Sequence, residues 1–228
     1  MHSTTQTRLR SGAQLLSDIV RRAPGDLRYL ASWATIRRRG RTTLEARVPY
    51  MPLSAVQFLE HHLYPGSIVF EWGGGGSTLW FADRVRTVIA VEHDRAWYAA
   101  LHDKLSMGTR AECSLLLREP QPLVPETPAG YLSSECVGNF QDYVHAIDAV
   151  PDEALDLVLV DGRCRASCLL RAASKVRPGG MLVLDDSDRD RYQSAAGTLA
   201  HWQRHDFRGL RPFYEWFAQT TCWVKTTR

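Results

Sequence analysis

Carboxylate side chains follow three separate apolar runs of the chain, at the point where each run ends. Glu92, Asp161 and the pair Asp185 and Asp186 each come directly after a short stretch rich in Val, Ile and Leu. Continuous apolar runs of this length are typical of strands buried on both faces of a parallel sheet. Because the carboxyl ends of parallel strands share one edge, we expect these acids to gather there. Carboxylates at such an edge could bind hydroxyl groups, a cationic ligand or a metal ion.

Residues 67–78, read as Ser-Ile-Val-Phe-Glu-Trp-Gly-Gly-Gly-Gly-Ser-Thr, combine an acid with a glycine-rich turn. The apolar run, the glycines and the amphipathic residues that follow predict a strand, a tight turn and a helix. Glycine lets a ligand approach the backbone, and the first amides of a helix lack partners. Glu71 at the strand end would repel a phosphate and attract a cation. The turn therefore favours a cationic ligand over the pyrophosphate of a dinucleotide.

The acid after the second predicted strand has the spacing of a nucleoside site. Glu92 lies 19 residues after Gly73, close to the separation at which an acid reaches the ribose hydroxyls of a bound nucleoside. Hydroxyls that donate to a carboxylate form charge-assisted hydrogen bonds of roughly 1.5–3 kcal/mol. The sequence thus predicts a ligand with a ribose ring.

Strand and helix patterns alternate along the chain, which predicts a doubly wound, Rossmann-like α/β fold. Its sheet should have seven mostly parallel strands, helices on both faces and a closing antiparallel strand pair. Four prolines exclude regular structure from residues 119–130, a stretch expected to form a lid or substrate loop. Strands are expected before Gly73 and over residues 87–91, 111–117, 155–160, 181–184, 207–213 and 220–225, and helices over 11–22, 26–38, 51–63, 79–84, 96–105, 140–147, 168–176 and 191–204.

Composition limits the classes of protein to which the chain can belong. At 228 residues and 44% hydrophobic, it can form one substantial core, alone or with an appendage. It lacks both an 18-residue apolar run and the apolar segment of a secretory signal. Its five cysteines are scattered and odd in number, which does not indicate a disulfide framework. We expect a cytoplasmic protein.

Positive charge is concentrated at the N-terminus. Residues 1–47 hold ten arginines and three acids, so the net charge of this segment is +7. The net charge of the whole chain is +3, so the remaining residues carry −4. We expect a basic helical N-terminal segment at 1–47, capping a catalytic or binding domain at 48–228. Its arginines could form a solvated face, bind an acidic substrate, or contact phospholipid headgroups of a membrane surface. Nucleic acid is disfavoured, because the segment lacks interleaved aromatic residues and a known binding module.

These features together resemble the class I S-adenosylmethionine (SAM) methyltransferases. The resemblance spans residues 53–225 and rests on the pattern Glu71-x-Gly73-x-Gly75-x-Ser77, the acids after the second and fourth strands, a Pro-Gly-Gly turn and the closing strand pair. It implies that Glu71 lies near the methionine amino group and that both glycines pack against SAM. It further implies that Ser77 bonds the SAM carboxylate, and that Asp161 faces the methionine end and the substrate.

For the nucleoside half of SAM, the resemblance implies that Glu92 holds the ribose and that His93 lies near the adenine. Methyl transfer requires alignment of donor and acceptor more than covalent help from the protein. We therefore expect methylation of a small-molecule or sugar hydroxyl, with an acidic substrate accommodated by arginine. Two alternatives remain: an aminopropyltransferase-like enzyme that uses decarboxylated SAM, and a non-catalytic binding protein on the same fold. The sequence does not indicate an oligomeric state.

A finer resemblance is to small-molecule O-methyltransferases that bind Mg²⁺ through acids after strands four and five. By that resemblance, Asp161, Asp185 and Asp186 would be the metal ligands. Hard oxygen ligands suit Mg²⁺, which would lower the pKa of an acceptor hydroxyl. The alternative for the acidic pair is capping of the next helix together with a cofactor contact.

The pattern offers several candidates for the catalytic base. The catechol-type enzymes carry a lysine where this chain has Arg163 and Arg165, and arginine does not deprotonate in proteins. The base would instead be an aspartate, a histidine or metal-bound water. Asp161, Asp186 and His145 are the candidate catalytic residues, although His145 also suits a purely structural role. The arginines could pair with the nearby acids or bind an anionic group of the substrate.

Overall fold

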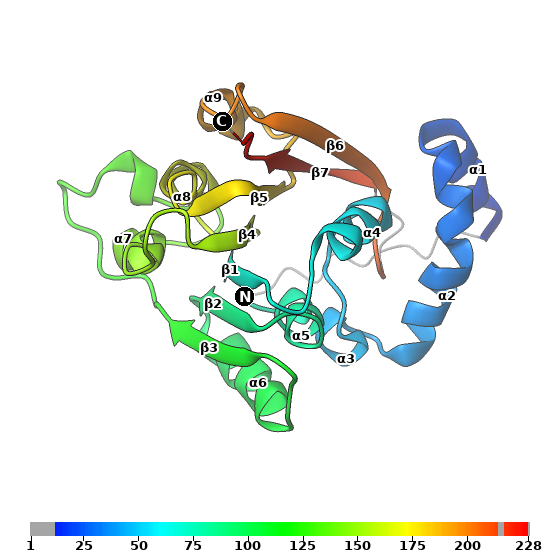
Figure 1. The fold of residues 1–228 in the computed structure, drawn as a ribbon, viewed down its shortest axis with the longest axis horizontal. Coiled ribbons are helices and arrows are strands. Elements are labelled where there is room, and N and C mark those ends of the chain that lie inside the picture. The colour runs from blue at the N-terminus through cyan, green and yellow to red at the C-terminus, as the bar shows by residue number, and fades with distance from the viewer. Residues whose placement is uncertain (1–11, 214–216, 228) are drawn as a thin grey trace.

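A seven-stranded sheet forms the centre of the protein in the computed structural model, which describes residues 12–213 and 217–227 (Figure 1). The strand order is β3-β2-β1-β4-β5-β7-β6, and β7 runs antiparallel to both of its neighbours. This confirms the predicted doubly wound α/β fold with a closing antiparallel pair. The strands are β1 (Ile68–Trp72), β2 (Thr87–Glu92), β3 (Glu112–Leu117), β4 (Leu155–Val160), β5 (Val176–Asp185), β6 (Gln203–Leu210) and β7 (Phe217–Val224).

Helices cover both faces of the sheet (Figure 1). The segments α4 (Leu53–His62), α5 (Gly76–Ala82) and α6 (Arg95–Ser106) lie on one face, and α7 (Gln141–Val144), α8 (Arg165–Ala172) and α9 (Gln193–Gly197) on the other. Shorter elements are α3 (Thr43–Ala46) and the 3₁₀ turns η1 (Pro24–Tyr29), η2 (Ala129–Tyr131), η3 (His145–Ile147) and η4 (Asp190–Tyr192). None of the helices in the described residues is long and apolar enough to cross a membrane.

The central strand β4 shows why this sequence builds a sheet covered on both faces. Alternate side chains of a strand point to opposite faces, so Val158 and Val160 pack with α8 while Leu157 and Leu159 pack with α4 and α5. All four are fully buried. A run that is apolar at successive positions can satisfy both layers at once. The carboxyl ends of β1, β2 and β4 are thereby held side by side.

The N-terminal helices α1 (Gly12–Arg22) and α2 (Leu30–Arg39) pack beside the sheet near β6 (Figure 1). Ile19, Tyr29, Leu53 and Leu210 form part of their shared apolar cluster. A buried carboxylate joins the layers, because Asp26 Oδ2 accepts a hydrogen bond of 2.5 Å from the Leu210 amide. The described part of the basic segment is thus anchored to the sheet, and the side chains of residues 37–39 are not buried.

Several element boundaries differ from the prediction, and two of these differences change the architecture. The expected helix over residues 191–204 ends at Gly197, because residues from Gln203 onward pair with β7 as the edge strand β6. The Pro-Gly-Gly sequence lies inside β5 instead of before it. Gly179 adopts φ +75° there, and its amide donates to the Lys225 carbonyl. Proline and glycine are tolerated at this point because the pairing with β4 shifts register beside it.

The proline-rich stretch continues as an irregular segment that lies against α8. Its only regular features within the described chain are η2 and two isolated bridges to Asn139. Ser167 Oγ on α8 donates to the Gly130 carbonyl (2.7 Å), and Arg191 pairs with Glu135 at 2.5 Å. Burial raises the pKa of Glu135, but hydrogen bonds from Arg191 and two serines outweigh it and lower the pKa to about 2. The segment is therefore pinned at both of these points.

Candidate functional site

A cavity of about 410 Å³ opens at the carboxyl edge of β1, β2 and β4. Three chain segments line it: residues 73–77 directly after β1, residues 92–94 at the end of β2, and residues 161–163 directly after β4. Thr43, Tyr50 and Trp97 complete the lining. The edge predicted from the three apolar runs thus carries a cavity in which the glycine turn, Glu92 and Asp161 meet.

Three of the four glycines of the turn have different structural roles. Gly73 adopts φ +91°, and a Cβ there would lie 2.7 Å from the Asp161 carbonyl oxygen. A Cβ on Gly76 would lie 2.5 Å from the Thr43 carbonyl oxygen, so this glycine allows the segment after α2 to pack on the turn. Gly75 has extended backbone, and a Cβ there would contact only Trp97, at 3.7 Å. Gly75 is therefore the glycine with open space above it.

Glu71 lies beneath the turn and does not line the cavity. Its side chain is fully buried, and Ser77 Oγ donates to Glu71 Oε2 at 2.7 Å. Glu71 Oε1 has no hydrogen-bond partner within the described structure. Burial raises the pKa of Glu71 to about 7, against the effect of the neighbouring Thr78 and Ser77 hydroxyls. The Ser77 hydroxyl donates its hydrogen bond to Glu71, so its oxygen can only accept a hydrogen bond from a ligand in the cavity. Such an acceptor suits the ammonium group of a ligand better than the ligand carboxylate that the sequence led us to expect at Ser77.

Glu92 closes the cavity at the end of β2. Its Oε1 accepts hydrogen bonds of 2.7 Å from the amides of His93 and Asp94, and His93 Nδ1 lies 2.8 Å from the same oxygen. These contacts fix the carboxylate at the cavity wall and occupy one of its two oxygens. His93 and Asp94 also line the cavity, and Asp94 caps α6 by accepting from the Trp97 amide.

The residues after β4 bring a carboxyl group and a guanidinium group to the opposite wall. Asp161 and Arg163 both line the cavity, separated by Gly162, where a Cβ would collide with the Tyr143 hydroxyl. Burial and the charge of Asp185 raise the pKa of Asp161 well above its ordinary range, although Arg165 and Arg211 act in the opposite direction. Within the described residues, the Arg163 guanidinium has no ion-pair partner, and its Nε is buried without a hydrogen bond.

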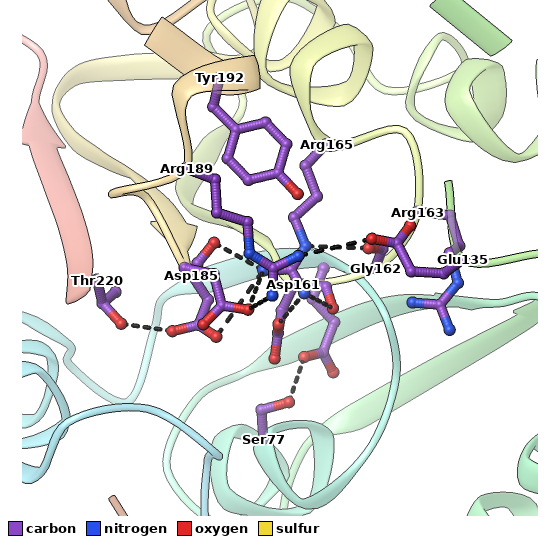
Figure 2. A network of polar contacts seen from close by, with 12 residues as sticks. Ser77, Glu135, Asp161, Gly162, Arg163, Arg165, Asp185, Arg189, Tyr192 and Thr220 are labelled. Atoms are coloured by element: carbon purple, nitrogen blue, oxygen red, sulfur yellow. Dashed lines mark hydrogen bonds and ion pairs between the residues drawn. The ribbon is translucent and has the colours of Figure 1, made fainter. Parts of the chain in front are cut away.

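The predicted magnesium ligands are held by arginine. Asp185 and Asp186 do not line the cavity. Arg165 bridges them to Asp161 (Figure 2). Arg211 pairs with Asp185 and Asp186 in the same buried network. Among residues 12–213 and 217–227, no three His, Cys, Asp or Glu side chains are placed to hold a metal ion. The residues present therefore do not fit Mg²⁺, and the predicted metal role of Asp161, Asp185 and Asp186 is not supported. Asp186 is likewise not positioned to contact a ligand of the cavity.

His145 lies outside the cavity lining. Its Nε2 is 2.9 Å from the Tyr131 hydroxyl and 2.8 Å from Arg171, while its Nδ1 lies 2.9 Å from Asp148. Both ring nitrogens are thus engaged in a network between η3 and α8. This corresponds to the structural alternative for His145, and the geometry does not support a catalytic role.

Sequence reasoning missed several residues of the lining, among them Thr43, Tyr50 and Trp97. Trp97 Nε1 donates to the Gly74 carbonyl at 2.6 Å, which ties α6 to the glycine turn. Its position five residues after Glu92, in the first turn of the next helix, was the available signal. Thr43 and Tyr50 come from the segment between α2 and α4. No motif marks them, because only the packing of that segment on Gly76 brings them to the cavity.

Comparison with known proteins identifies the fold. A methyltransferase-like protein from Silicibacter pomeroyi aligns with a TM-score of 0.56 and 22% identity, over 79% of this chain and 89% of that one. An rRNA methylase from Streptococcus thermophilus gives 0.54 and 13% identity, over 79% and 99%. The O-methyltransferase TomG from Streptomyces achromogenes, solved with SAM, gives 0.50 and 15% identity, over 77% and 78%.

Comparisons by sequence, unlike those by structure, found no match. It matches no protein-family model, and no curated protein is significantly similar to it. The structural likeness nevertheless agrees with the strand order and with the antiparallel closing strand described above. The chain therefore has the fold of the class I SAM-dependent methyltransferases.

Proposed function

We propose that the protein is a SAM-dependent methyltransferase that acts on a hydroxyl group of a small molecule or sugar. One observation carries the proposal: a single cavity joins the glycine turn, the Glu92 carboxylate and Asp161 at the sheet edge. Its volume of about 410 Å³ falls within the range of roughly 300–1,000 Å³ that is usual for small-molecule sites. The fold, shared with solved methyltransferases, supports the same function.

The nucleoside end of SAM suits the wall formed by residues 92–97. One oxygen of Glu92 is engaged by backbone amides, which leaves the other to accept from the ribose hydroxyls. The indole of Trp97, hydrogen-bonded to Gly74, gives the cavity an aromatic surface beside the turn.

The amino-acid end of SAM suits the opposite wall. The Ser77 oxygen, backed by the buried Glu71 carboxylate, can accept a hydrogen bond from the ammonium group. Arg163 offers a guanidinium whose buried Nε has no hydrogen-bond partner among the described residues, and guanidinium groups bind carboxylates bidentately. We therefore assign the ammonium to Ser77 and Glu71, and the carboxylate to Arg163.

SAM would supply the sulfonium methyl group, and the chain would align the acceptor with it. Asp161 lines the cavity, and its pKa is raised by burial and by Asp185. A carboxylate with a raised pKa can accept the proton that the acceptor hydroxyl loses. Asp161 is thus the best-placed base in the cavity.

Calorimetric titration separates this function from its two alternatives. We expect SAM and S-adenosylhomocysteine to bind the full-length protein, and label from methyl-tritiated SAM to pass to a low-molecular-mass extract. Preference for decarboxylated SAM would indicate an aminopropyltransferase. Binding without transfer would indicate a binding protein, and absence of binding would contradict the whole proposal.

The role of Arg163 has its own test. Arg163→Gln should weaken S-adenosylhomocysteine binding about 10- to 100-fold, because a bidentate ion pair is lost. Methylthioadenosine lacks the carboxylate, so its affinity should not change. Arg86→Gln is the matched control, since Arg86 is exposed and precedes β2 at the opposite end of the sheet. An equal loss for both ligands would exclude a contact with the carboxylate.

A further inference from the structure

Three aspartates at the ends of β4 and β5 occupy the positions at which the sequence predicts a magnesium site, yet two buried arginines lie in the same cluster. Figure 2 shows Arg165 between Asp161 and Asp185. Arg165 is the first residue of α8, and Arg211 follows β6. Their exposed fractions are only 9% and 4%. Buried guanidinium groups are rare unless they are paired, so these two belong to the construction of the site.

Arg165 ties the ends of β4 and β5 together. Its Nη2 lies 3.0 Å from Asp161 Oδ1, and its Nη1 lies 3.8 Å from Asp185 Oδ2 and 3.7 Å from Asp186 Oδ2. It also donates to backbone carbonyls, from Nε to Gly162 at 3.0 Å and from Nη1 to Asp185 at 2.6 Å. The rigid guanidinium thus bridges the same acids that a metal ion would bridge.

Arg211 binds the acidic pair from the other side. Its Nη2 donates to both oxygens of Asp185 at 3.0 Å and to Asp186 Oδ1 at 2.7 Å. Thr220 Oγ1 adds a hydrogen bond of 2.5 Å to Asp185 Oδ1. The Arg211 guanidinium also lies over the ring of Tyr50, 5.1 Å from its centroid, and Tyr50 lines the cavity.

The charges of the cluster are already balanced. When ionised, Asp161, Asp185 and Asp186 carry three negative charges. Arg165 and Arg211 supply two positive charges, and the half-exposed Arg189 pairs with Asp186. Mg²⁺ requires near-octahedral oxygen ligands at about 2.0–2.1 Å. A divalent ion placed among these oxygens would meet two buried cations at close range, where like charges repel more strongly than in water because the dielectric constant is lower.

We propose that Arg165 and Arg211 take the place of a divalent cation, so that the acids after β4 and β5 form a metal-independent arginine–aspartate centre. Of the three acids, the centre presents only Asp161 to the cavity. The consequence of this centre for catalysis rests on the proposed function. It implies an acceptor that need not chelate a metal, and so excludes a requirement for two adjacent hydroxyls of the catechol type. The ion-binding prediction itself does not depend on SAM.

The first test uses Mn²⁺ alone with the full-length protein, followed by electron paramagnetic resonance. We expect no saturable binding up to about 1 mM Mn²⁺, and a melting temperature that neither Mg²⁺ nor EDTA changes by more than about 1 °C. Saturable Mn²⁺ binding that Mg²⁺ displaces, and that Asp186→Ala abolishes, would overturn the proposal. Failure of SAM to bind would instead contradict only the proposed function.

The second test removes one buried cation. Arg211→Met leaves Asp185 and Asp186 undercompensated, so its melting temperature should fall by about 5–15 °C and Mg²⁺ should partly restore it. Arg189→Met, which removes a half-exposed arginine from Asp186, is the matched control and should change little. If Arg211→Met does not fold, the additional substitution Asp185→Asn should restore folding by removing the excess charge. An Arg211→Met protein with wild-type stability and no response to Mg²⁺ would overturn the proposal.

Discussion

At the scale of single residues, two buried glutamates near the cavity differ in how their charge is compensated. Glu92 receives two backbone amides on one oxygen. Glu71 receives the Ser77 hydroxyl on Oε2 and nothing on Oε1 within the described structure. The first carboxylate is prepared to accept neutral hydroxyls. The second pays a desolvation cost that a nearby cation would relieve.

The raised pKa of Glu71 predicts a pH dependence of stability and of binding. Its folded-state pKa is about 7, against an ordinary value of 4.5, so folding disfavours the ionised form. The free energy of unfolding should therefore fall as pH rises from 4.5 to about 7. Glu71→Gln should abolish this fall and be more stable at pH 8 by on the order of 1–3 kcal/mol in urea unfolding.

Ligand binding should show the opposite trend with pH. An ammonium group beside Ser77 favours ionised Glu71, so S-adenosylhomocysteine should bind up to about tenfold more tightly at pH 7.5 than at pH 5.5. Methylthioadenosine has no ammonium and serves as the control ligand. If Glu71→Gln retains the full pH dependence in calorimetry, another group is responsible for it.

Substitutions of Glu92 test whether its carboxylate binds the ligand or only holds the backbone amides after β2. Glu92→Ala should weaken S-adenosylhomocysteine binding by about 10- to 100-fold, because the acceptor of the ribose hydroxyls is removed. Glu92→Gln keeps an oxygen for the backbone amides and should lose less. The control is Glu112→Gln, an exposed acid at the start of β3. Unchanged affinity in Glu92→Ala would contradict the ribose assignment.

At the scale of elements, two adjacent glycines in the turn between β1 and α5 have different roles: Gly76 is needed for folding, and Gly75 leaves space for a ligand. Gly76 is confined by the carbonyl oxygens of Thr43 and Val48, whereas Gly75 has open space in the cavity. The extended backbone of Gly75 accepts any side chain, so a substitution there fills the ligand's space without straining the chain.

A pair of substitutions tests this division of roles. Gly75→Val should fold with nearly wild-type stability and lose S-adenosylhomocysteine binding by at least about 100-fold, because the side chain blocks the cavity. Gly76→Val should instead destabilise the fold by roughly 1–3 kcal/mol or more, through the displaced segment after α2. Thermal unfolding and calorimetry on both variants measure the two effects. Tight binding by Gly75→Val would place the ligand away from the turn.

At the scale of the whole molecule, the N-terminal helices and the sheet meet at one buried carboxylate. Asp26 Oδ2 accepts from the Leu210 amide, and a Cβ on Gly209 would collide with that same carboxylate. The segment that follows these helices provides Thr43 and Tyr50 to the cavity. Docking of the N-terminal segment is thereby linked to the shape of the site.

Asp26→Ala should weaken this docking. Loss of the hydrogen bond leaves the Leu210 amide without its partner, which should lower the free energy of unfolding by about 1–3 kcal/mol. Asp103→Ala, at an exposed position on α6, is the control. Urea unfolding measures the difference, and equal stability of the two variants would show that Asp26 does not hold the segment.

The sheet could be predicted well from the sequence, because its signals are local. The apolar runs that became β2 and β4 reveal burial on both faces, and the acid that ends each of them is adjacent in the chain. Since parallel strands bring such ends to one edge, the meeting of the glycine turn, Glu92 and Asp161 followed from pattern alone. The class I methyltransferase fold could be inferred for the same reason.

Only the tertiary structure decided how the acids at that edge are compensated. Arg211 lies 25 and 26 residues from its aspartate partners, and Arg165 reaches carboxylates of two different strands. The pair of Arg165 with Asp161, four residues away, was among the alternatives open from the sequence, whereas no local pattern encodes the Arg211 pairs, because they depend on which arginines the folded chain buries. The same is true of Thr43, which reaches the cavity through the packing of its segment on Gly76. Sequence alone determined where charge would gather; three-dimensional packing determined that arginine, bound to Asp185 and Asp186, would neutralise it.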